Sequence, residues 1–166
     1  MTALRIFSIA SVLVMCACAD PVVEIQLSFP SEDAFLRSNT ASLDIFSGDT
    51  AGACDALLAN PNVAPPGAEA AAASGVLDVC AFDKEGDGGV VFEKLPLGKH
   101  AFFAQVYSGS NDVILRGCTI QEVAATREED PTPVVISMAK TSAFVDDDEL
   151  TCANAQDKCQ EKTPCL

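Results

Sequence analysis

The side chains of this sequence most able to do chemistry are its eight cysteines. Cys16 and Cys18 close an apolar N-terminal run, and the other six are spread over the rest of the chain: Cys54, Cys80, Cys118, Cys152, Cys159 and Cys165. No two are spaced as C-x-x-C and the chain has one histidine, so the clustered ligands of a zinc site are absent. An even number of cysteines is typical of disulfides formed in an oxidising compartment. We therefore expect three disulfides, no metal and no cofactor.

The pairing of these six cysteines stays open at the level of the sequence. Three of them lie in an acidic C-terminal tail with almost no apolar side chains, which cannot form a core of its own. Because three cysteines cannot all pair with one another, at least one disulfide must join the tail to the body. If Cys152 and Cys159 share a short helix, about 10 Å separates them along its axis, too far for a bond. We favour Cys54 with Cys118, and Cys80 with a cysteine of the tail.

The N-terminus has the order of a signal peptide. Arg5 precedes an apolar run, residues 6–15, that is too short to span a bilayer as a stable helix. The residues that follow resemble the lipobox of bacterial lipoproteins, in which a small residue precedes the cysteine that becomes the lipidated N-terminus. Ala17 before Cys18 fits this pattern, and Cys16 is the alternative.

The resemblance implies a signal peptide over residues 1–17 and a lipid anchor at Cys18. Cleavage there removes Cys16 and leaves an even six cysteines, whereas cleavage before Cys16 would leave an odd thiol. Several acyl chains hold a protein stably at a membrane. In that family an Asp directly after the lipidated cysteine favours the inner membrane. Ala19 stands at that position, so we expect an outer-membrane lipoprotein of the cell envelope.

Short apolar runs separated by turn residues predict about seven strands. In the first of them, Val23, Ile25, Leu27 and Phe29 share one face of the strand. The predicted strands cover residues 22–29, 42–46, 76–82, 90–93, 100–107, 113–123 and 133–138. This pattern is typical of an all-β, antiparallel β-sandwich. We expect an anchor linker at 18–21, the sandwich at 22–140 and a disulfide-stapled, acidic tail at 141–166.

Two stretches interrupt the strands. "ACDALLAN", residues 53–60, favours one or two helical turns before Pro61. "PNVAPPGAEAAAASG", residues 61–75, has no periodicity and is predicted to be an exposed loop. An alanine helix over residues 68–73 is the alternative, although so short a helix is unstable alone in water.

The stretch "VVFEKLPLGKHAFFAQVYSGSNDVILRGCTIQEV" joins two strands through a Leu-Pro-x-Gly turn. It resembles carboxypeptidase-regulatory-like and transthyretin-like sandwiches. Secreted lipoproteins of myxobacteria resemble it too, with the Gly117–Cys118 pair after a hairpin and Cys54 before Ala56 and Leu57. The resemblance is strongest over residues 76–139 and implies an immunoglobulin-like or transthyretin-like sandwich.

One loop has the opening of a calcium site. In "DKEGDGG", Asp83, Glu85 and Asp87 alternate before a glycine, and carboxylate oxygens at that spacing suit Ca²⁺. The twelfth position, where a bidentate acid belongs, is Lys94. We therefore expect a hairpin turn with solvated acids, and a calcium-dependent adhesion module is the alternative.

Catalytic chemistry finds little support in the sequence. A lone histidine at the start of a strand, as His100 is, is expected to pack or to lie at the surface. Serines occur outside any G-x-S-x-G elbow, and disulfide-bonded cysteines are not nucleophiles. We expect a binding or structural module that is not an enzyme. A secreted hydrolase or inhibitor-like domain acting on a surface polymer is the alternative, and it would need a cleft near His100.

The net charge of −14 repels phosphate backbones, so nucleic acid is not an expected partner. The expected partners are the membrane, through the lipid anchor, and an envelope protein or polysaccharide. Sheet edges and the loop at residues 61–75 are the surfaces at which we expect contact.

Overall fold

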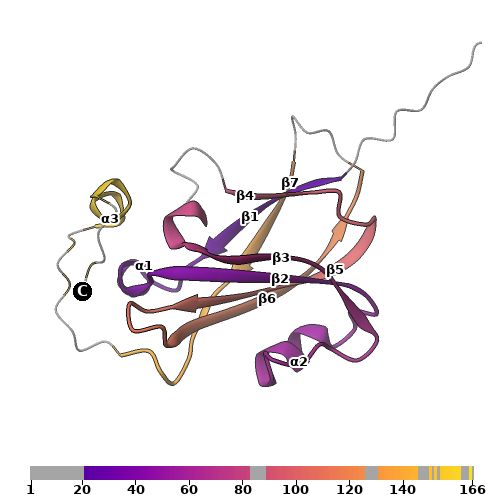
Figure 1. The fold of residues 1–166 in the computed structure, drawn as a ribbon, viewed down its shortest axis with the longest axis horizontal. Coiled ribbons are helices and arrows are strands. Elements are labelled where there is room, and N and C mark those ends of the chain that lie inside the picture. Colours follow the sequence, from indigo (N-terminus) through magenta and orange to yellow (C-terminus); the bar gives the residue numbers. More distant parts are fainter. Residues whose placement is uncertain are drawn as a thin grey trace, which may run out of the picture.

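The computed structural model describes residues 21–82, 89–125, 131–145, 150, 152, 154–161 and 165. Figure 1 shows strands stacked in layers, with α1 and α3 near one end of the strands and α2 near the other. In chain order the elements are β1 (Val22–Ser28), α1 (Glu32–Arg37), β2 (Thr40–Gly48), α2 (Ala53–Ala59), β3 (Ala68–Asp78), the 3-10 helix η1 (Val79–Phe82), β4 (Val90–Glu93), β5 (Gly98–Tyr107), β6 (Val113–Val123), β7 (Thr132–Ser137), β8 (Ala139–Lys140) and α3 (Ala155–Glu161).

Two sheets face each other across the main core. The smaller sheet has the order β4-β1-β7 and the larger has the order β3-β2-β5-β6-β8. Six of the seven predicted strands lie within a few residues of their expected bounds, and disulfides hold the C-terminal tail. The structure therefore confirms the predicted β-sandwich.

One strand pair departs from the expected antiparallel arrangement. β1 is antiparallel to β4, but it is parallel to β7, with Val23 opposite Thr132 and Ser28 opposite Ser137. Parallel neighbours need a long connection between them, and here nearly the whole sandwich separates the two strands in sequence. The expectation of a purely antiparallel sandwich was wrong for this pair.

The prediction of an exposed loop over residues 61–75 was wrong for its second half, and so was the alternative of an alanine helix. β3 begins at Ala68 and pairs with β2 from Thr40–Asp78 to Gly48–Ala68. Alanine is uncommon in strands, so the sequence shows no β signal there, and the backbone hydrogen bonds of β2 decide the conformation. The strand predicted over residues 76–82 is the end of β3 followed by η1.

Alternate residues of the strands fill the space between the sheets. Val23, Ile25 and Leu27 of β1 are buried as the alternation predicts, and they pack in one cluster with Leu43 of β2 and Phe102 of β5. Burial of such large apolar side chains is the main stabilising term of the fold.

The second stretch predicted to break the strands, residues 53–60, is helical as expected and forms α2. This helix covers the outer side of the larger sheet, where Leu57 packs with Phe46 and Phe103. The disulfide between Cys54 and Cys118 fastens α2 to β6.

Gly117 of β6 allows residues 137–138, which connect β7 of the smaller sheet to β8 of the larger sheet, to pass close to its backbone. After β7 the chain turns at Met138 into β8, which pairs with β6 at Arg116–Ala139. A Cβ atom on Gly117 would lie 2.6 Å from the carbonyl oxygen of Ser137 and 2.7 Å from the sulfur of Met138. Only glycine therefore allows this close approach.

We expect Gly117→Ala to lower the free energy of unfolding by about 1–3 kcal/mol, because the added methyl group must displace backbone. Urea unfolding of the purified protein measures this loss. Glu122→Ala, at an exposed position of the same strand, is the matched control and should stay within about 0.5 kcal/mol. An equal effect of the two substitutions would contradict the close approach at Gly117.

Candidate functional site

All six cysteines after residue 18 are paired in the structure. Cys54 bonds Cys118 within the sandwich, Cys80 bonds Cys159, and Cys152 bonds Cys165. Both favoured pairings are thus present, and Cys152 and Cys159 bond different partners. Such a set of bridges indicates an oxidising compartment.

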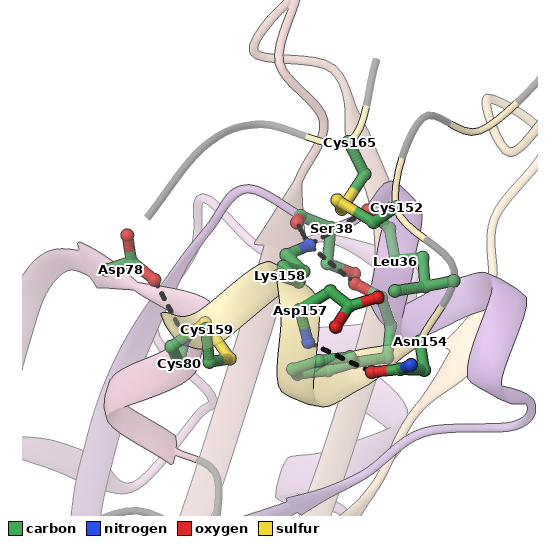
Figure 2. The surroundings of a disulfide bond; sticks show 11 residues. Leu36, Ser38, Asp78, Cys80, Cys152, Asn154, Asp157, Lys158, Cys159 and Cys165 are labelled. Carbon is green, nitrogen blue, oxygen red and sulfur yellow. Dashed lines mark hydrogen bonds between the residues drawn. A yellow bond between two sulfur atoms is a disulfide. The ribbon is translucent and has the colours of Figure 1, made fainter. Parts of the chain in front are cut away.

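The acidic tail is docked on the sandwich through a small apolar cluster of its own. Phe35 and Leu36 of α1 pack there with Val79 of η1 and with Cys165. Cys80–Cys159 is the covalent link between this cluster and α3, and Cys152–Cys165 closes a loop within the tail. Figure 2 shows the two bridges on either side of Lys158.

Helix α1 begins at a local N-cap. Ser31 is the N-cap and its hydroxyl accepts a hydrogen bond from the amide of Ala34 at 3.1 Å. Glu32 and Asp33 follow in the first turn, where negative charge favours the helix dipole. The helix ends at Arg37, and Ser38 donates its hydroxyl to the carbonyl oxygen of Ala34 at 2.7 Å and its amide to that of Phe35 at 3.1 Å. The last turn of a helix has further carbonyl groups that need donors from outside the helix.

Lys158 of α3 supplies those donors. Its Nζ donates to the carbonyl oxygens of Phe35 at 2.7 Å and of Leu36 at 2.9 Å, and also to that of Ser38. The three bonds match the three N–H groups of an ammonium, as Figure 2 shows. The residue is only 5% exposed, so a buried cation joins the tail to the end of α1.

Burial lowers the pKa of the Lys158 ammonium to about 8, against the opposing attraction of the Asp78 carboxylate. The side chain is therefore still largely charged at neutral pH. Asp78 also accepts a hydrogen bond from the amide of Cys80 at 2.8 Å, which places its charge beside the Cys80–Cys159 bridge.

On another side of α1 lies a surface hollow of about 120 Å³. It is lined by Arg37, Ser108, Ser110, Asp112, Ile114, Ala143, Phe144 and Val145. Pockets that enclose small ligands usually have volumes of about 300–1,000 Å³. The hollow is thus too small to enclose a substrate of that size, although a single side chain of a partner would fit.

The polar side chains of this hollow are largely committed to the turn between β5 and β6. The hydroxyl oxygens of Ser108 and Ser110 lie 2.9 Å apart, and Ser110 donates to Asp112 at 2.8 Å. Arg37 is bonded to the Asp33 carboxylate at 3.1 Å. No histidine lies beside these serines. The chain's one histidine is near the start of β5, and the turn with the serines follows the other end of that strand.

His100 lies in the core. It is 1% exposed, and its Nδ1 lies 3.0 Å from the carbonyl oxygen of Gly98. Its Nε2 is buried without a hydrogen-bond partner among the described residues. The imidazole is therefore not presented to solvent, where a polymer substrate would have to meet it.

The calcium candidate, Asp83, Glu85 and Asp87, lies outside the described residues, as do Cys16, Cys18 and the acidic run at residues 146–149. In the described part of the chain, no three metal-ligating side chains gather in one place. There too, no helix has the length and apolar character needed to cross a membrane.

Comparison with protein-family models, with curated proteins and with solved structures gives no match for this chain. The likeness to transthyretin-like sandwiches and to myxobacterial lipoproteins thus stays a prediction. The buried contacts of Lys158 are not predictable from the sequence, because an isolated lysine in an acidic tail gives no signal of burial.

Proposed function

We propose that this protein is an exported, lipid-anchored β-sandwich of the cell envelope that acts by binding or by supporting envelope structure, without catalysis. The observation that carries the proposal is the complete pairing of the six cysteines after residue 18 in three bridges. An oxidising compartment requires export, and export agrees with the signal-peptide order of the N-terminus.

The anchor is assigned to Cys18. With the six downstream cysteines in disulfides, Cys18 has no cysteine left to pair with once the signal peptide and Cys16 are removed. Acylation consumes that thiol. Ala19 after the anchor favours the outer membrane.

A binding role suits the surfaces that the sandwich offers. β3 is an 11-residue edge strand whose sheet neighbour, among the described residues, is β2. Such an edge can accept an extended segment of an envelope protein or the chain of a polysaccharide. The burial of His100 disfavours a hydrolase that would use this imidazole as its base.

Mass spectrometry of the protein from its native membrane fraction tests this proposal. We expect an N-terminal acylated Cys18 and a mass, after correction for the lipid, six hydrogens below that of the reduced chain. Cys18→Ser should abolish acylation and release the protein from the membrane, whereas Cys16→Ser, the matched control, should leave both unchanged. An unmodified N-terminus or free thiols among the six cysteines would overturn the proposal.

A further inference from the structure

The turn between β4 and β5 is fixed beside the start of the sandwich. Val22 pairs with Glu93, and the amide of Lys94 donates to the carbonyl oxygen of Pro21 at 3.0 Å. Leu95 is buried in the main core and so fixes the turn to the sandwich. Two residues later Leu97 is 64% exposed, so this turn holds a large apolar side chain out into its surroundings.

The proposed anchor lies very close to this turn in the chain. Only three residues lead from Cys18 to Pro21, and a fully extended chain of that length spans about 11 Å at most. The headgroup region of a bilayer leaflet is itself on the order of 5–7 Å deep. If Cys18 is acylated, this short reach keeps the turn close to the membrane surface.

The composition of the turn suits that surface. Residues 94–99, "KLPLGK", contain two lysines and no acid in a chain that has 24 acids and 10 bases. Acids also lie near the turn: Glu93 precedes it, Asp20 precedes Pro21 in the sequence, and Glu122 is opposite Lys99 in the strand pairing. Lysine stems extend along apolar surface while their ammonium groups reach phosphates, and leucine enters the headgroup boundary.

We propose that the Lys94–Lys99 turn is a membrane-contact surface that rests on the bilayer, with Leu97 inserted at the headgroup level and the two lysines at lipid phosphates. The inference rests on the proposed lipid anchor. It also orients the molecule, because β5 runs from this turn to the end that holds α1, the docked tail and the hollow (Figure 1). That far end then faces away from the membrane.

Tryptophan fluorescence tests the contact, since the chain contains no Trp of its own. Leu97→Trp is introduced into the full, acylated protein, which is reconstituted in vesicles of phosphatidylethanolamine and phosphatidylglycerol with brominated acyl chains. The matched control is Val145→Trp, at a 54% exposed position lining the hollow at the opposite end. We expect the emission of the first variant to shift to the blue and to lose at least about half its intensity, and that of the second to remain unchanged.

Because Trp itself favours membrane interfaces, amide hydrogen exchange of the unsubstituted protein gives a second measurement. The reference is the Cys18→Ser variant in solution, which carries no lipid. Relative to it, amide exchange at residues 97–99 should slow at least about threefold when the acylated protein is bound to vesicles. If the protein is acylated and bound to vesicles but residue 97 behaves like residue 145 in both measurements, the membrane contact is wrong and the anchor stands. A protein that carries no lipid overturns both proposals.

Discussion

Replacing Cys80 and Cys159 together by alanine is expected to cost about 4 kcal/mol of unfolding free energy, the largest single effect we expect in this protein. The bridge spans 79 residues, and a cross-link over so long a loop removes much of the entropy of the unfolded chain. It is also the disulfide that joins α3 to the sandwich, so its loss should let the tail leave α1. Urea unfolding measures the first effect, and amide exchange in α3 measures the second.

The matched control is Cys152→Ala with Cys165→Ala. That bridge spans 13 residues and lies within the tail, so the same entropic argument gives about 3 kcal/mol and α3 stays attached. If the first double variant keeps the amides of α3 protected, the apolar cluster and Lys158 hold the tail without the bridge. An unchanged unfolding free energy of the Cys80→Ala, Cys159→Ala variant would contradict the stabilisation expected from this bridge.

The sequence was most informative where a strand has one buried and one exposed face. The alternation from Val23 to Leu27 predicted β1 and its buried side chains, because a period of two has a single structural meaning. β3 has no such alternation, since alanine fits a helix, a loop or a strand. Its conformation depends on β2, whose paired residues lie 20 to 38 positions away in sequence.

Helix α1 was missed although the sequence contained its signal. Ser31 followed by Glu32 and Asp33 is the pattern of a helix N-terminus, and the structure uses it that way. The choice among tail cysteines, by contrast, had no local signal. Whether Cys80 meets Cys152, Cys159 or Cys165 depends on where η1 and α3 pack, which is tertiary information.

The cap that Lys158 forms on α1 is equally tertiary, and its removal is expected to have the second large effect. Lys158→Met keeps the length of the side chain but removes the ammonium donor to the carbonyl groups of Leu36 and Ser38. The carbonyl group of Phe35 loses one of its two donors and keeps the amide of Ser38, at 3.1 Å. We expect a loss of about 2–4 kcal/mol in unfolding free energy at pH 7, because unpaired buried acceptors are costly. Lys99→Met, at an exposed position, is the control and should stay within about 0.5 kcal/mol.

The difference in unfolding free energy between the parent protein and Lys158→Met should depend on pH. This dependence distinguishes a buried ammonium from a side chain that only fills space. With a folded-state pKa of about 8 against 10.5 in the unfolded chain, Lys158 releases its proton first in the folded state, and unfolding above pH 8 takes a proton up. The contribution of Lys158 to stability therefore rises with pH between about 8 and 10.5. The unfolding free energies of the parent and of Lys158→Met should diverge by a further 1–2 kcal/mol, on the order expected from linkage, between roughly pH 7 and 9.5. Because all other titrating groups are common to both proteins, a constant or shrinking difference would show that Lys158 is not buried as a cation against the end of α1.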